Sequence, residues 1–167
     1  MDASEAAQAR TEIWKYHDEE DREGCAEAGS KLLEELSDES SEEFNGEYIR
    51  RAFWLADEAE KYQREGDEEL EDYFYKKAGE LLEAAWRSAG LPTEQLEHRI
   101  GWWKAYRHGD MSKAKNDMYN EHLTMSGDEE VAREATGKLA EATREHGENN
   151  WSEVERKLTE YHGIIDF

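Results

Sequence analysis

The sequence predicts an all-α protein of about eight helices, and three observations support that class. Apolar residues recur at steps of three and four along most of the chain, as they do on one face of an α-helix. Helix-favouring Ala, Glu, Leu, Lys and Arg dominate, and Pro92 is the single proline. No window alternates apolar and polar residues for long enough to indicate a strand. The 167 residues suit a single domain, 1–167.

The apolar stripes group into four antiparallel hairpins. We expect these over about residues 3–37, 41–89, 94–125 and 128–162, followed by a short C-terminal tail at 163–167. The pairs expected to cap helix N-termini are Ser40 with Glu43, Ser126 with Glu129, and Asn150 with Glu153. The predicted turns lie near Gly24 and Gly66, at Gly109-Asp110, and at Gly147 to Asn150. The hairpins could stack as an open repeat array or form a closed helical bundle.

The segment "YQREGDEELEDYFYKKAGELL" resembles tetratricopeptide-like (TPR-like) repeats. Tyr62, Gly66, Tyr75 and Ala78 stand at positions that this family favours, and "YRHGDMSKAKNDM" gives a second, partial match. Glu71 departs from the pattern, because the family prefers a small residue there. The resemblance covers about residues 40–125 and implies a scaffold that binds peptides or proteins without catalysis.

The composition is strongly acidic. Asp and Glu number 43 against 21 Lys and Arg, so the formal net charge is −22. Nucleic acids and anionic membranes carry the same sign, and we expect neither as a direct partner. Three explanations remain open: a salt-rich cytoplasm of the halophilic type, ordinary solvated helix faces, and mimicry of a nucleic-acid backbone.

Motifs for catalysis or cofactor binding are missing from the sequence. It contains no Gly-x-Ser-x-Gly, His-Glu-x-x-His, glycine-rich phosphate loop or Cys-x-x-Cys. The six histidines lack the Glu-x-x-His spacing of di-iron bundles and are interpreted as solvated surface residues. We therefore expect no enzyme activity, no cofactor, no metal and no small-molecule substrate.

Cysteine content and the chain's N-terminal sequence suggest the compartment. The lone Cys25 cannot form an intramolecular disulfide and is expected to be a small residue of ordinary reactivity. The N-terminal residues lack a basic start followed by an apolar core, and no run is long enough to span a bilayer. These features predict a cytoplasmic protein.

A basic, aromatic island interrupts the acidic chain at "IGWWKAYRHGD", residues 100–110. The periodicity assigns Leu96, Ile100 and Trp103 to the core, which leaves the direction of Trp102 and Tyr106 open. One interpretation is that Trp102 packs against the preceding hairpin while the bases neutralise acidic neighbours. The other is a partner-binding site made of the following residues: Arg99, Trp102, Lys104, Tyr106 and Arg107.

These observations lead to three functional hypotheses. The first is a non-catalytic interaction, adaptor or assembly module of a salt-adapted organism or its virus, which binds a protein partner or a second copy of itself. The second is an acidic nucleic-acid mimic that inhibits a DNA-binding protein. The third is an enzyme or metal-binding helical bundle whose site the sequence spacing does not reveal.

Overall fold

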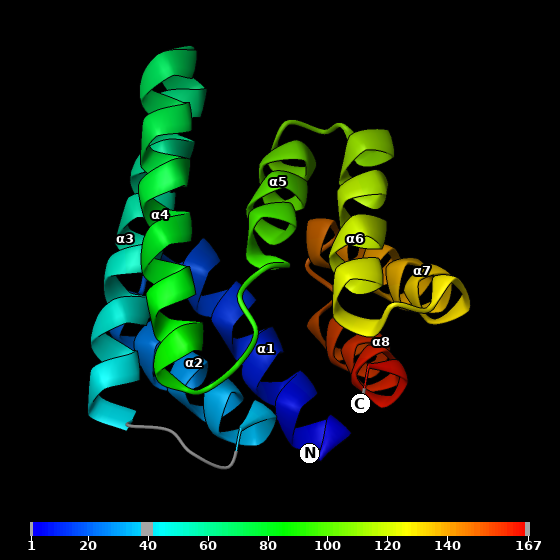
Figure 1. Ribbon diagram of the computed structural model, residues 1–167. Coiled ribbons are helices and arrows are strands. Elements are labelled where there is room, and N and C mark those ends of the chain that lie inside the picture. Colours follow the sequence, from blue (N-terminus) through cyan, green and yellow to red (C-terminus); the bar gives the residue numbers. More distant parts are fainter. Residues whose placement is uncertain (1, 38–41, 166–167) are drawn as a thin grey trace. The chain divides into compact units, whose positions relative to one another are not determined.

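A computed structural model describes residues 2–37 and 42–165, apart from the side chains of residues 42–45. Within these ranges the chain forms eight α-helices, as predicted (Figure 1). They are α1 (Ala3–Asp18), α2 (Arg22–Leu36), α3 (Glu42–Glu65), α4 (Glu68–Ser88), α5 (Leu96–Arg107), α6 (Met111–Ser126), α7 (Glu129–Gly147) and α8 (Trp151–Ile164). None of these described helices is long and apolar enough to cross a membrane.

Consecutive helices pair into the four predicted hairpins. Helix α3 packs on α4, α5 on α6, and α7 on α8. Helix α1 meets α2 where the thiol of Cys25 donates to the carbonyl oxygen of Ile13 at 3.7 Å. Contacts of α2 with α3 and of α6 with α7 join successive hairpins.

The chain divides into two compact units. Unit 1 comprises Met1–Thr11 and Glu94–Phe167, and unit 2 comprises Glu12–Thr93, so α1 contributes residues to both. Within unit 1, the start of α1 contacts α8, because Nε of Arg10 donates to Nε2 of His162 at 3.0 Å. The assignment of the chain to a single domain remains a prediction.

Three of the four predicted turns lie where the sequence placed them. Gly66 and Gly109 have φ values of +78° and +77°, a left-handed conformation that glycine adopts without steric cost. The prediction at Gly24 is wrong, because Gly24 lies inside α2, whereas the turn predicted at Gly147 to Asn150 is confirmed, since α7 ends at Gly147 and α8 begins at Trp151. The left-handed residues of those two connections are Glu20 and Asn149.

The helix N-termini are capped mainly by aspartates. Asp21, Asp67, Asp110 and Asp128 each accept a hydrogen bond from a backbone N–H of the first turn.

The structure tests two of the three predicted capping pairs. Ser126 belongs to α6, so its predicted role as the cap of α7 is wrong and Asp128 takes it. Asn150 does precede α8, but its side chain makes no capping hydrogen bond there. The pair Ser40 with Glu43 lies outside the described residues.

A glycine controls the packing of α2 on α3. A Cβ atom at Gly29 would lie 2.7 Å from Cγ2 and 2.8 Å from Cδ1 of Ile49, whose side chain is fully buried. We expect Gly29→Ala to lower the free energy of unfolding by about 1 to 3 kcal/mol, because overpacking outweighs the better helix propensity of alanine. Urea denaturation followed by circular dichroism measures the change.

Gly137 of α7 provides the matched control. It is exposed and helical, and a Cβ atom there would have no neighbour within 4 Å. Gly137→Ala should therefore raise the free energy of unfolding by about 0.5 to 1 kcal/mol. A Gly29→Ala variant as stable as Gly137→Ala would contradict the close packing of α2 on α3.

Candidate functional site

The structure places the predicted partner-binding residues on α5, where two of them are engaged inside unit 1. Trp102 is 3% exposed, and its ring makes an edge contact with Trp103 at a centroid distance of 5.9 Å. Nε of Arg99 donates to Oε1 of Glu121 at 2.9 Å. The predicted core stripe is correct at Leu96 but wrong at Ile100 and Trp103, which are only half-buried. Trp102 and Ala105 are buried in their place.

The remaining members of that set are half-buried. The hydroxyl of Tyr106 donates to the carbonyl oxygen of Thr143 at 3.0 Å and lies 2.8 Å from Nδ1 of His146. The guanidinium of Arg107 stacks over Trp103, 5.5 Å from the ring centroid. Lys104 is also half-buried. These contacts are those of packing within unit 1, and partner binding by this set stays a prediction.

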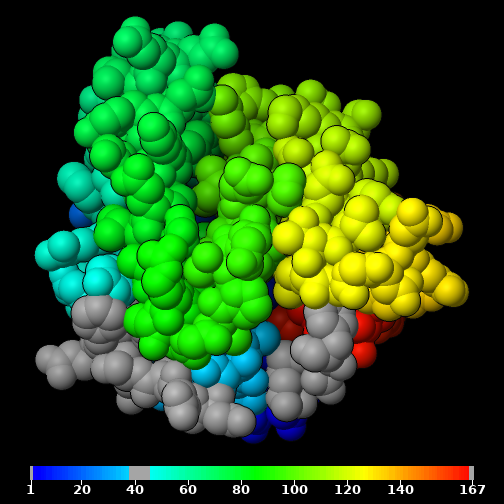
Figure 2. Space-filling view, viewed as in Figure 1, coloured from blue at the N-terminus to red at the C-terminus, as the bar shows by residue number. Residues whose placement is uncertain are grey.

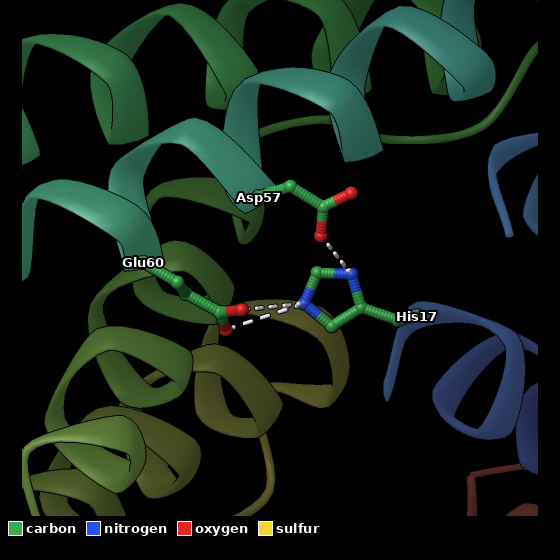
Figure 3. A group of neighbouring side chains, drawn as sticks. All are labelled: His17, Asp57 and Glu60. Atoms are coloured by element: carbon green, nitrogen blue, oxygen red, sulfur yellow. Dashed lines mark hydrogen bonds and ion pairs between the residues drawn. The ribbon is translucent and has the colours of Figure 1, made fainter. Parts of the chain in front are cut away.

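Unit 2 holds a buried histidine between two carboxylates (Figure 3). Nδ1 of His17, on α1, lies 3.1 Å from Oδ1 of Asp57, and Nε2 lies 3.2 Å from Oε2 of Glu60. Both carboxylates come from α3, where a spacing of three residues places them on one face. The imidazole therefore joins α1 to α3.

The surroundings favour the charged form of His17. Burial by itself lowers the pKa of this imidazole, but ion pairs with Asp57 and Glu60 raise it to about 9. Nε of Arg22 lies 4.0 Å from Oδ2 of Asp57, so two cations face two carboxylates. The charges of this buried cluster are balanced by its own members.

Among the described residues, this trio is the group whose ligand atoms lie close enough for a metal ion, within 4.8 Å of one another. The two carboxylates face different ring nitrogens, so one nitrogen and one carboxylate could share an ion while the other carboxylate orients the ring. Binding would first require loss of the imidazolium proton. The observed geometry suits an imidazolium, since each ring nitrogen meets an acceptor.

Unit 1 holds a second buried polar cluster, between α5, α6 and α8. Glu121 is fully buried; burial raises the pKa of its carboxyl, but Arg99 outweighs this and lowers it overall. Nδ1 of His122 donates to the carbonyl oxygen of Met118, so Nε2 of the neutral ring accepts from the hydroxyl of Tyr161, at 2.6 Å. Burial lowers the pKa of His122 and raises that of Tyr161 to about 12.

Arg10 and His162 extend this cluster to α1. Arg10 is 6% exposed, and its guanidinium lies over the ring of Tyr161, 5.6 Å from the centroid. Because arginine can only donate, Nε2 of His162 accepts from it and the neutral ring carries its proton on Nδ1. Burial lowers the pKa of His162 to about 2, so the ring stays neutral at neutral pH.

These two clusters correct the interpretation of the histidines as surface residues. Four are buried: His17, His122, His146 and His162. Each buried ring contacts side chains or carbonyl groups, and the partners of His17, His146 and His162 come from distant helices. Adjacent glutamates suggested solvent exposure, and nothing in the sequence spacing indicated these partners. Cys25 is buried as well, and burial raises the pKa of its thiol to about 12, in agreement with the expected lack of reactivity.

The exposed large apolar side chains of the described chain all lie on the α3–α4 hairpin: Trp54, Leu70 and Tyr73. Tyr73 is 52% exposed and meets Phe74 at a centroid distance of 5.3 Å, and Phe74 stacks on Tyr62 at 5.5 Å. Leu70 lies one turn before them on α4. We call Tyr62, Leu70, Tyr73 and Phe74 the tip patch.

The two long helices of this hairpin reach beyond α2 at their Gly66 end (Figure 1). The same end lies at the molecular surface in the space-filling view (Figure 2). Within unit 2, α2 lies against α3 at Gly29 and Ile49, and α1 meets α3 where His17 contacts Glu60. Comparisons with protein families, curated proteins and solved structures found no match to this chain.

Proposed function

We propose that this protein is a non-catalytic interaction module of a salt-adapted organism or its virus, and that it docks a protein partner on the tip patch. One observation carries the proposal: Leu70 and Tyr73, which are 37% and 52% exposed, lie side by side on α4 in an otherwise acidic chain. Exposed apolar clusters rimmed by charge are typical of protein interaction sites.

The surroundings of the tip patch indicate the chemistry of its partner. Exposed acidic residues flank it along α3 and α4: Glu65, Glu68, Glu69 and Asp72. Nζ of Lys77 lies 5.7 Å from the ring centroid of Tyr73, so the ring already accepts a cation from this chain. A partner with an apolar centre and basic rim would complement both features.

A tetratricopeptide-like character of the hairpins belongs to the same proposal. The residues that carry the resemblance lie on α3, its turn and α4, with Gly66 at the left-handed turn and Tyr75 and Ala78 buried. These positions support a repeat-like hairpin. The expected binding role of that class of scaffold agrees with docking on the tip patch.

Paired substitutions test this surface. The variant Leu70→Ser, Tyr73→Ser removes the exposed part of the tip patch, and we expect partners captured from the source organism to be reduced at least about tenfold, as for loss of an interface hot spot. Trp54→Ser is the matched control, because Trp54 is 40% exposed on the same hairpin but lies about 12 Å from Tyr62 along α3. The variant Lys104→Glu, Arg107→Glu tests the predicted surface on α5.

The outcomes separate the hypotheses. Loss of the same partner in the tip-patch variant alone supports the proposal, whereas loss only in the α5 variant would place the interaction at residues 99–107. A partner that DNA displaces, and that survives the loss of the tip patch, would favour the acidic mimic, for which the net charge of −22 is the supporting observation.

A further inference from the structure

Helix α4 carries opposite charges at equal distances on either side of Tyr73. Glu69 lies four residues before this tyrosine and Lys77 four residues after it, so the three side chains follow one stripe of the helix. Glu69 is exposed, Tyr73 is 52% exposed, and the side chain of Lys77 is 43% exposed. The acid and the base therefore lie about 6 Å to either side of an exposed ring, one toward each end of α4.

A stripe of this kind is complementary to a second copy of itself. When two such helices lie antiparallel with their Tyr73 side chains at the centre, a residue four positions before the ring faces one four positions after the ring of the other copy. Glu69 of each copy then meets Lys77 of the other, and a twofold axis makes the two contacts identical. A parallel arrangement would place like charges opposite each other, so the pattern selects the antiparallel one.

The exposed apolar residues of the tip patch lie at the centre of this arrangement. Leu70 is 37% exposed and comes three residues before Tyr73, so it faces Lys76 of the other copy, three residues after the ring. The methylene groups of an exposed lysine cover an apolar neighbour while the ammonium stays in water. Apolar contact supplies the affinity, and the exposed ion pairs mainly set the orientation, since each contributes little in water.

The present contacts of the two charged residues leave them able to bind a second copy. Among the described residues Glu69 makes no ion pair of its own. Nζ of Lys77 lies 5.7 Å from the ring centroid of Tyr73 and 3.5 Å from Oε2 of Glu80. An ammonium group has three donors, so the pair with Glu80 can persist while Glu69 of the other copy approaches.

General charge repulsion is weaker at this end of the hairpin than over the rest of the chain. Between Lys61 and Lys77 six acids are accompanied by four bases, whereas the whole chain carries a formal net charge of −22. At about 0.15 M salt the Debye length is about 8 Å, so more distant charges on the two copies are largely screened from this contact.

We propose that the occupant of the tip patch is a second copy of this chain, docked antiparallel through α4 so that Glu69 of each copy meets Lys77 of the other. The inference rests on the proposed function, because it names the partner that the tip patch docks. The contact involves one helix from each copy, so the dimer is weak and depends on protein concentration.

Sedimentation equilibrium of the whole chain tests self-docking. In about 0.15 M NaCl, raising the protein concentration from about 10 µM to about 1 mM should shift the weight-average mass from 19.5 kDa toward twice that value. The variant Leu70→Ser, Tyr73→Ser removes the apolar centre and should keep the mass of a monomer over the same range.

An exchange of charges then locates the contact. Glu69→Lys leaves two bases on the stripe and Lys77→Glu leaves two acids, and each variant alone should dimerise at least about tenfold more weakly, because the twofold axis applies every substitution twice. An equimolar mixture of the two variants should regain the wild-type Kd, since opposite charges again face each other. Recovery in the mixture also shows that both variants fold.

A matched variant excludes an effect of net charge. Glu69→Lys makes the chain less negative, so relief of general repulsion would strengthen dimerisation, the opposite of the expected result. Glu134→Lys makes the same change in net charge at an exposed position of α7 and should not weaken the dimer. Equal weakening by Glu69→Lys and Glu134→Lys would overturn the assignment to α4.

The outcomes separate this inference from the proposed function. A wild-type chain that stays monomeric at about 1 mM would overturn self-docking, whereas loss of a foreign partner in Leu70→Ser, Tyr73→Ser would still uphold the tip patch as a docking surface. A dimer that survives that double substitution would overturn the inference, and so would a mixture of Glu69→Lys with Lys77→Glu that remains monomeric.

Discussion

Glu121→Gln should be among the most destabilising single substitutions in this protein, lowering the free energy of unfolding by about 3 kcal/mol or more. Glu121 is fully buried, and its carboxylate contacts Arg99 at 2.9 Å and attracts Arg10 from farther away. Glutamine preserves the shape but removes the charge, so the buried guanidinium of Arg99 loses this compensating carboxylate. Urea denaturation of both proteins at one pH measures the difference.

Two controls distinguish a buried charge effect from general loss of an ion pair. Glu153 pairs with Arg156 at 2.7 Å on the surface of α8, and Glu153→Gln should have a far smaller effect, because water solvates the charges that remain. The double variant Arg99→Met, Glu121→Met removes both buried charges and should be more stable than Glu121→Gln. Equal destabilisation by Glu121→Gln and Glu153→Gln would contradict the burial of this pair.

The helices are the part of the structure that sequence reasoning predicts best. The periodic stripes placed a helix at about residues 41–65, and α3 spans Glu42–Glu65. Such stripes are local, and they follow from the need of each helix to bury one face. Turn positions were predicted less well, since glycine serves two purposes in this chain. Gly24 lies inside α2, where a Cβ atom would come within 2.6 Å of the Tyr16 ring.

The island on α5 shows a limit of periodicity. Apolar residues at positions 100, 102, 103, 105 and 106 support two overlapping stripes, and the sequence does not decide between them. The observed helix buries Trp102 and leaves Trp103 half-buried, against His146 at a ring distance of 6.2 Å. That partner comes from α7, in the next hairpin along the chain. Tertiary contacts, and not local pattern, selected the buried tryptophan.

The buried polar clusters could not be predicted from spacing. Asp57 and Glu60 share a helix face, but their partner His17 lies 43 residues from Glu60. His162 lies 152 residues from Arg10. A histidine beside a glutamate in a charged chain has the composition of a solvated face, and only the pairing of distant helices reveals otherwise.

Stability should peak near pH 6.5, because two buried histidines have pKa values displaced in opposite directions. The pKa of His17 rises from 6.5 in the unfolded chain to about 9, since two carboxylates outweigh the effect of burial. Its stabilising contribution is complete below pH 6.5 and is lost as the pH rises toward 9, a total of about 3 kcal/mol at 1.36 kcal/mol per pKa unit.

His162 has the opposite effect on the acidic side. Burial and the two nearby guanidinium groups lower its pKa to about 2, so the folded protein keeps the ring neutral while the unfolded chain binds a proton below pH 6.5. Its contribution is present above pH 6.5 and is lost as the pH falls. His122, whose pKa burial also lowers, acts in the same direction.

Variants of His17 and His162 show which histidine causes the loss of stability on each side of pH 6.5. Urea denaturation between about pH 5 and about pH 9.5 should show that His17→Gln loses the decline in stability above pH 6.5. His162→Gln should reduce the slope below pH 6.5 and leave the alkaline limb intact. The groups that surround His17 include the two carboxylates, the ring of Phe53 at a centroid distance of 5.3 Å, and Arg22, which contacts Asp57. An alkaline decline of equal size in His17→Gln would mean that another group, such as the Cys25 thiol with its pKa of about 12 in the folded state, controls that limb. A stability that keeps rising through pH 9 in the wild type would show that His17 is not held as an imidazolium between α1 and α3.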